Sequence, residues 1–131
     1  MINIEELRIG NWVSYLGTNT QINSISIGES CSYVSTFKSG IVSQEQIKPI
    51  QLTEKILINS GFEKDYYGFL GDIELSYGEY LFSLCVNSTR KSLFLSINSA
   101  EYALSNIPVN YLHQLQNIYF DLTGKKLKVE L

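Results

Sequence analysis

The sequence has few of the residues that carry most metal and enzyme chemistry. Among its 131 residues are a single histidine, His113, and two cysteines, Cys31 and Cys85. A structural zinc site needs four closely spaced soft ligands, and the chain has neither a CxxC motif nor a Cys/His cluster, which argues against such a site. We expect Cys31 and Cys85 to be buried free thiols, with a disulfide between them left open.

Charge is also scarce, and its balance is slightly acidic. Ten Lys and Arg against 13 Asp and Glu give a net charge of −3. Binding to duplex nucleic acid needs several basic side chains on one face, and no such stripe is visible, so this class of partner is disfavoured. The one basic cluster, residues 125–128, follows a predicted helix end, where cations favour the exposed carbonyl groups. Phosphate binding is the alternative interpretation of that cluster.

Long hydrophobic runs are missing as well. No apolar stretch approaches the roughly 20 residues that a membrane-spanning helix needs. The first ten residues, MINIEELRIG, carry two Glu and no apolar core of the kind that a signal peptide has. We therefore expect a cytoplasmic protein that does not enter a membrane.

Catalytic motifs are absent from the sequence. There is no Gly-x-Ser-x-Gly elbow to accompany His113 as a general base, and no Gly-rich loop of the phosphate-binding type. Asp72 and Glu74 alternate with apolar residues, so we interpret this carboxylate pair as the solvent-facing side of a strand rather than a catalytic pair. The sequence predicts no cofactor and no metal, and a non-enzymatic protein.

The first part of the chain is rich in short strand signals separated by glycine. Residues 7–50 predict four strands at a spacing of about ten residues, which is typical of a small antiparallel barrel or a curled sheet. Ile22 is out of phase with Ile25 and Ile27, which indicates a bulge, and Pro49 indicates an edge position. We predict an SH3-like, β-barrel-like unit over residues 1–50.

The second part of the chain, residues 51–131, alternates between helical and strand periods. Thr53 as N-cap and Gly61 as stop predict a helix over 53–60. Clean alternation predicts a three-stranded antiparallel meander within about 66–97. Pro108 at the first helical position and Gly124 at the end predict a longer helix over 108–123, and alternation in LKVEL predicts a strand over 126–131. The fold class is α+β, with both parts forming one compact domain.

The helix predicted over 108–123 has unusual residues opposite its apolar stripe. His113, Gln116, Asn117 and Phe120 lie on that far face or its flank. Rings that anchor and amides that orient suit a protein contact, and also suit a nucleobase held by stacking and edge hydrogen bonds. We predict a binding surface there, to which Asn11 and Trp12 contribute. The other interpretation is that both faces of the helix are covered, with Phe120 packed on the N-terminal sheet.

Three stretches, LRIGNWV, LTEKILINSGF and YLHQLQNIYFDLTG, resemble a group of small uncharacterised proteins from phages and mobile elements of Bacteroidetes bacteria. The stretches occur in the same order as in that group and bracket nearly the whole chain, with Ile118 in place of a leucine. The resemblance assigns no catalytic residue. It implies expression in the cytoplasm of a bacterial host cell.

Together these observations favour a binding protein. The first hypothesis is a non-enzymatic phage or mobile-element protein that binds a host protein, as an inhibitor or adaptor. The second is a nucleotide-binding sponge that sequesters a host defence signal, and a homo-oligomer is compatible with either. A small hydrolase using His113 is a third, weaker hypothesis.

Overall fold

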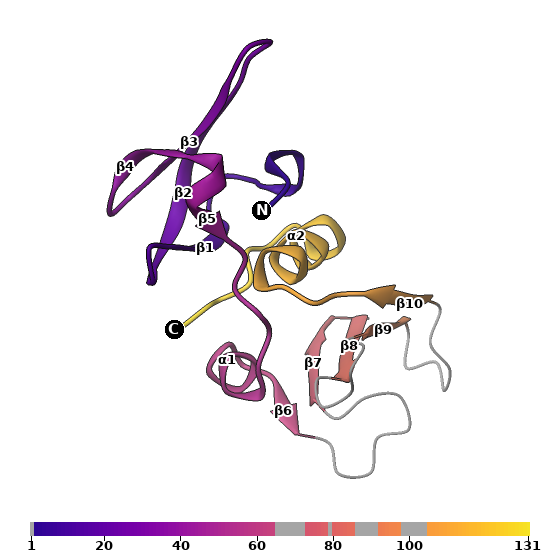
Figure 1. Ribbon diagram of the computed structural model, residues 1–131. Coiled ribbons are helices and arrows are strands. Elements are labelled where there is room, and N and C mark those ends of the chain that lie inside the picture. The colour runs from indigo at the N-terminus through magenta and orange to yellow at the C-terminus, as the bar shows by residue number, and fades with distance from the viewer. Residues whose placement is uncertain (1, 65–72, 79, 86–91, 98–104) are drawn as a thin grey trace. The chain divides into compact units, whose positions relative to one another are not determined.

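The computed structural model describes residues 2–64, 73–78, 80–85, 92–97 and 105–131 (Figure 1). The chain divides into two compact units. Unit 1 comprises Met1–Gln51 and Tyr111–Leu122, and unit 2 comprises Leu52–Asn110 and Thr123–Leu131. Strands and helices occur together, so the α+β class predicted from the sequence is confirmed.

Unit 1 is built on a curled antiparallel sheet whose last strand returns beside its first. In the described residues the sheet has five strands in the order β4-β3-β2-β1-β5. β2 and β3 form a long hairpin (Figure 1). The strands are β1 (Trp12–Tyr15), β2 (Thr18–Ile27), β3 (Ser32–Thr36), β4 (Gly40–Ser43) and β5 (Ile47–Lys48).

The predicted bulge and edge position in unit 1 are confirmed. The pairing of β2 with β3 shifts register between Ile22 and Ser24, which brings Ile22 back to the buried face. β5 ends at Pro49 and lies at one end of the strand order. The core of this unit is formed by buried aliphatic side chains from the sheet and the N-terminal segment: Ile2, Ile4, Leu7, Val13, Ile22, Val34, Val42 and Ile47.

The prediction of four strands over residues 7–50 is wrong by one, because the last part of this segment forms two strands. The segment forms β4, then a 3-10 turn η2 (Gln44–Gln46), then β5 on the opposite side of the sheet. The Ser43 side chain accepts a hydrogen bond from the Glu45 amide at 3.4 Å, which starts the turn. This side-chain hydrogen bond therefore competes with the backbone hydrogen bonds of the sheet, and the chain turns away from β4 at this point.

Unit 2 begins with helix α1 (Glu54–Asn59), close to the predicted bounds. Thr53 Oγ1 accepts a hydrogen bond from the Ile56 amide at 3.2 Å, as expected of an N-cap. Gly61 follows the helix with φ at +98°, a left-handed conformation that glycine adopts without steric cost. Leu52 and Leu57 are both buried, which agrees with an apolar contact across the cap.

The sheet of unit 2 contains the predicted meander. β7 (Ile73–Tyr77), β8 (Tyr80–Cys85) and β9 (Ser92–Ile97) pair antiparallel, with Leu75 opposite Phe82 and Phe82 opposite Leu95. Two strands that the sequence did not predict, β6 (Glu63–Lys64) and β10 (Ser105–Pro108), extend the sheet at its two sides. The predicted strand residues 66–72 lie outside the described residues.

The start of the second helix was predicted wrongly. Helix α2 spans Leu112–Thr123, whereas Pro108 is the last residue of β10, paired with Ser92. The fixed φ of proline suits a strand end as well as a first helical turn, so Pro108 did not distinguish the two. The helix instead begins after Tyr111, whose amide donates to Gln114 Oε1 at 3.2 Å. Gly124, with φ at +71°, ends the helix as predicted.

The strand predicted over 126–131 is absent, since residues 126–131 pair with no other strand in the described part of the chain. The alternating pattern of apolar and charged residues is reflected only in side-chain burial, since Leu127 is buried and Lys128 is exposed. No helix in the described part of the chain is long and apolar enough to span a membrane.

Candidate functional site

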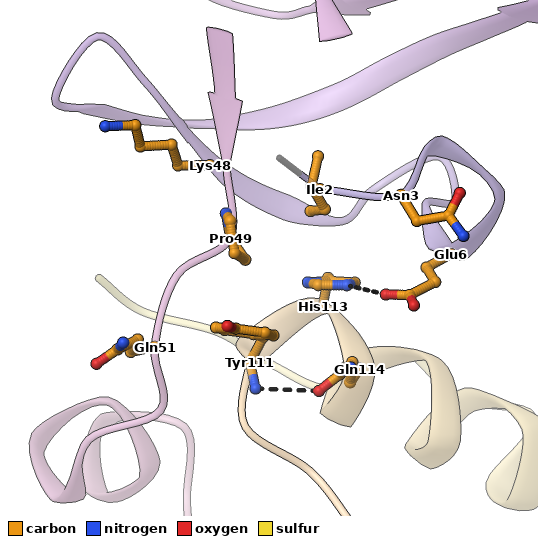
Figure 2. Close-up of a pocket in the computed structure, with 9 residues that line it drawn as sticks. All are labelled: Ile2, Asn3, Glu6, Lys48, Pro49, Gln51, Tyr111, His113 and Gln114. Atoms are coloured by element: carbon orange, nitrogen blue, oxygen red, sulfur yellow. Dashed lines mark hydrogen bonds and ion pairs between the residues drawn. The ribbon is translucent and has the colours of Figure 1, made fainter. Parts of the chain in front are cut away.

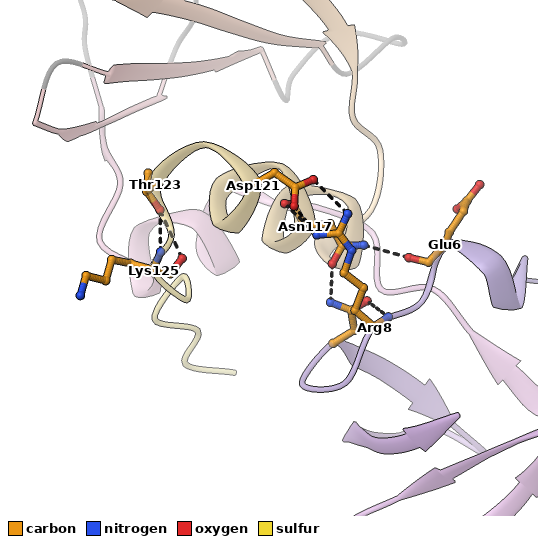
Figure 3. Close-up of polar contacts among 7 residues, drawn as sticks. Glu6, Arg8, Asn117, Asp121, Thr123 and Lys125 are labelled. Carbon is orange, nitrogen blue, oxygen red and sulfur yellow. Dashed lines mark hydrogen bonds and ion pairs between the residues drawn. The ribbon is translucent and has the colours of Figure 1, made fainter. Parts of the chain in front are cut away.

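The far face of α2 is held against the 6–12 segment of the same unit by side-chain amides. Asn117 Nδ2 donates to the Glu6 carbonyl oxygen at 2.8 Å (Figure 3). Asn117 Oδ1 accepts from Asn11 Nδ2 at 2.9 Å, and Asn11 Oδ1 accepts from the Arg8 amide at 2.8 Å. Asn11 is buried, so these bonds satisfy groups that water reaches poorly.

Gln116 makes two further hydrogen bonds to the same segment. Its Oε1 accepts from the Trp12 amide at 2.9 Å, and its Nε2 donates to the Gly10 carbonyl oxygen at 3.3 Å. Gly10 has φ at +93°, the left-handed conformation that turns this carbonyl toward its donors. The side-chain amides of Gln116 and Asn117 therefore both donate and accept hydrogen bonds within unit 1.

An ion pair lies at the outer end of the amide cluster. Arg8 contacts Asp121 through both guanidinium nitrogens, with Nη2 at 2.9 Å from Oδ2 (Figure 3). The hydrogen bond to Asp121 raises the pKa of Arg8, and the bond from Arg8 lowers the pKa of Asp121. The side chains are 47% and 55% exposed, so solvent screens the pair and its contribution to stability is small.

His113 is buried, with 1% of its surface exposed, and is bound on one side only. Its Nε2 lies 3.3 Å from Glu6 Oε2, while Nδ1 has no hydrogen-bond partner in the described residues. Burial lowers the pKa of His113, and the bond and charge of Glu6 oppose that shift without cancelling it. The ring is therefore neutral at pH 7. Because a carboxylate only accepts, Nε2 carries the proton and Nδ1 is a free acceptor.

A cavity of about 510 Å³ lies beside His113 (Figure 2). Figure 2 shows the second ring nitrogen on the side of Pro49 and Tyr111, away from the bond to Glu6. The rings of Tyr111 and His113 are nearly parallel, at 11°, with centroids 6.0 Å apart. The lining residues, all from unit 1, are Ile2, Asn3, Glu6, Lys48, Pro49, Gln51, Tyr111, His113 and Gln114.

This cavity has the character of a binding pocket. His113, the Glu6 carboxylate and the Tyr111 ring line a space of the size that small ligands occupy. Ser, Thr and Cys are missing from the lining in the described residues, so no nucleophile of these three types faces the Glu6–His113 pair there. The described residues also contain no group of three or more His, Cys, Asp and Glu that could hold a metal ion.

The predicted binding residues have different environments. Asn11, Gln116 and Asn117 are bonded within unit 1. His113 lines the cavity, and Trp12 is half-buried in β1. Phe120 is 45% exposed, so the interpretation that the N-terminal sheet covers this ring is wrong.

Glu6, Arg8 and Tyr111 were not singled out as site residues from the sequence. The sequence did contain a signal: Glu6 directly precedes the LRIGNWV stretch and Arg8 is its second residue, while Tyr111 begins the YLHQLQNIYFDLTG stretch. These two stretches contact each other directly in unit 1.

The other candidates from the sequence have separate positions. Asp72, half of the carboxylate pair, lies outside the described residues, and Glu74 accepts from Ser83 Oγ at 3.0 Å. Cys31 is exposed just before β3, which corrects the expectation of a buried thiol; its Sγ donates a hydrogen bond to Tyr33 Oη at 3.7 Å. The side chain of Cys85 is not among those described.

The outer face of the β3–β4 hairpin exposes large apolar side chains. Tyr33 is 44%, Phe37 69% and Ile41 76% exposed. Ile41 lies opposite Ser35, two residues from Tyr33, so Tyr33 and Ile41 share the face opposite to buried Val34 and Val42. β4 is also the last strand at its side of the sheet within the described residues.

Two independent features are therefore available for binding, both in unit 1: the cavity at His113 and the β3–β4 hairpin. Neither depends on a residue outside the described part of the chain. Comparison of the chain with protein-family models, with curated protein sequences and with solved structures finds no match.

Proposed function

We propose that this protein is a non-enzymatic binding module that captures an extended segment of a host protein along strand β4. The observation that carries the proposal is that β4 is the last strand at one side of its sheet, among the residues that the structure describes. β4 has the sequence Gly-Ile-Val-Ser, with neither a charge nor a proline. Natural proteins usually place such residues on edge strands to prevent pairing, and their absence favours strand addition by a partner.

The opposite edge of the same sheet provides the contrast. β5 contains Lys48, is followed by Pro49 and comes directly after the turn η2. A charge and a proline protect this edge in the usual way. Protection of one edge only supports a specific role for the other.

The side chains around β4 define the partner. Backbone pairing supplies affinity, and the exposed apolar groups Phe37 and Ile41 supply contacts for alternate side chains of the incoming strand. We infer an uncharged, extended segment with apolar residues at every second position. The strand order with a 3-10 turn before β5 supports assigning unit 1 to the SH3-like class.

The biological setting belongs to the same proposal. From the resemblance to phage and mobile-element proteins of Bacteroidetes we infer that the protein acts in the cytoplasm of a bacterial host cell, where capture of a host protein would inhibit or redirect that protein. The nucleotide-sponge hypothesis is a second candidate, and the cavity at His113 favours it.

The experiment for strand capture compares matched variants. Tagged wild-type protein, Ile41→Lys and Ile58→Lys are used to isolate proteins from a Bacteroidetes lysate; Ile58 is an exposed apolar residue of α1 and serves as the control. We expect a stoichiometric protein with wild type and Ile58→Lys, and at least about tenfold less with Ile41→Lys, because a lysine disfavours edge pairing. Amide exchange of Gly40–Ser43 should slow in the complex.

Two results would contradict the proposal. One is equal capture by Ile41→Lys and wild type. The other is a wild-type dimer that Ile41→Lys dissociates in sedimentation experiments, since the edge would then pair with a second copy of this chain.

A further inference from the structure

The cavity beside His113 contains a buried acceptor that nothing in the described residues satisfies. Leaving such a group without a partner is unfavourable in free energy. The Nδ1 atom of His113 is in this state, although the ring is almost completely buried and its other nitrogen is bonded to Glu6. Figure 2 shows this nitrogen on the Pro49 and Tyr111 side of the ring. A ligand that donates a hydrogen bond would remove the cost.

Glu6 determines what kind of ligand fits. Its carboxylate can only accept a hydrogen bond, so it keeps the proton of His113 on Nε2. Nδ1 must then be approached by an N–H or O–H group. A fully deprotonated anion offers only acceptors, so it could not donate to Nδ1, and any anion would meet the charges of both Glu6 and Lys48 in the lining.

The remaining lining favours a flat, uncharged heterocycle. Tyr111 provides an aromatic wall next to the acceptor, and Ile2 and Pro49 provide apolar surface. Gln51 adds an amide, which both donates and accepts. A volume of about 510 Å³ is within the range that nucleoside-sized ligands occupy.

We infer that the cavity of unit 1 is a binding site for an amino-bearing nucleobase, whose exocyclic N–H donates to Nδ1 of His113 while its ring contacts Tyr111. Glu6 acts as a positioning residue that fixes the tautomer of His113. The inference deepens the nucleotide candidate and is independent of strand capture at β4.

The test compares two nucleosides that differ only in hydrogen-bond donors. Adenosine carries an exocyclic amino group, and N6,N6-dimethyladenosine has the same ring system without that donor. We expect adenosine to bind at least about tenfold more tightly, as measured by calorimetry with the full-length protein. Because His113 is the only histidine, nitrogen-15 labelling gives one imidazole, and its Nδ1 resonance should shift on adding adenosine.

A charge-inverting variant tests the role of Glu6. In Glu6→Lys an ammonium group, which only donates, replaces the carboxylate, so the imidazole proton should move to Nδ1. We expect the nitrogen-15 spectrum to report this tautomer and adenosine affinity to fall at least about tenfold. Glu5→Lys makes the same charge change at the neighbouring exposed residue, and it should leave both readouts unchanged.

Three results would overturn the inference. They are equal affinity for the two nucleosides, no shift of the Nδ1 resonance with adenosine, cytidine or guanosine, or unchanged adenosine binding in Glu6→Lys once the proton is on Nδ1. Strand capture is judged separately, because Ile41→Lys should leave adenosine binding intact and Glu6→Lys should leave partner capture intact.

Discussion

At the scale of single residues, His113 gives unit 1 a pH dependence with a definite sign. Burial lowers the pKa of His113 from its ordinary value of 6.5, so below that pH the unfolded chain binds more protons than the folded one. The contribution of His113 to stability is therefore fully present above pH 6.5 and is lost as the pH falls below it.

The measurement is urea unfolding at pH 7.5, 6.5 and 5.5, followed by fluorescence of Trp12, the only tryptophan in the chain and a residue of unit 1. We expect the midpoint to decrease toward pH 5.5. A midpoint that rises over this interval would mean that Glu6 dominates over burial, with the opposite sign of the pKa shift.

The amide cluster predicts a second residue-scale effect. Asn11→Ala leaves the Arg8 amide and Asn117 Oδ1 without their partner, and Asn11 is buried. We expect a loss of about 1–3 kcal/mol in the free energy of unfolding of unit 1, measured by Trp12 fluorescence. Asn19→Ala, at an exposed position of β2, is the control and should stay within about 0.5 kcal/mol of wild type.

The sequence identified the unusual residues at this scale but not what they do. The position of His113, Gln116 and Asn117 opposite the apolar stripe was visible from helical spacing. Their partners, Glu6, Gly10 and Asn11, are about a hundred residues away along the chain, and one sequence without its fold gives no means of pairing them.

At the scale of elements, the N-cap of α1 should be a measurable part of unit 2. Thr53→Ala removes the hydroxyl that accepts from the Ile56 amide, and we expect a loss of about 1 kcal/mol by urea unfolding followed by circular dichroism. Thr53→Ser keeps an acceptor at this position and should recover most of the loss. Equal losses in both variants would assign the effect to the lost methyl group instead.

Elements whose signals are local were predictable, and elements that depend on a distant partner were not. Helix α1 was predicted closely because Thr53 and Gly61 act within one turn of its ends. The start of α2 was missed because Pro108 belongs to β10, where it pairs with Ser92. Residues 126–131 form no strand, because alternating apolar residues indicate which face of a strand is buried but do not provide a neighbouring strand to pair with.

At the scale of the whole molecule, unit 1 is discontinuous in sequence. Its two segments meet where Gln51 pairs with Tyr111 and where the Leu112 amide donates to the Ile50 carbonyl at 2.8 Å. Residues 52–110 therefore leave and rejoin unit 1 at neighbouring positions. This is the arrangement that tolerates insertion of one unit within another.

A fragment experiment follows from this arrangement. Residues 1–51 alone lack every α2 partner of Glu6, Gly10 and Trp12, so we expect no cooperative unfolding transition of Trp12 fluorescence. Residues 1–51 joined to 111–124 by a short Gly-Ser linker should recover one. A cooperative transition in the 1–51 fragment would show that α2 is dispensable for this unit.

The same discontinuity governs how the protein is made. A ribosome releases residues 1–51 well before Tyr111–Leu122 emerge, so the amino-terminal strands must wait, incomplete, while all of residues 52–110 are translated. During that interval the Trp12 amide and the Gly10 carbonyl lack the Gln116 side chain that binds them in the folded unit. Synthesis therefore includes a stage in which the N-terminal strands lack these hydrogen bonds. That stage ends only when Gln116 and Asn117 bind the N-terminal segment.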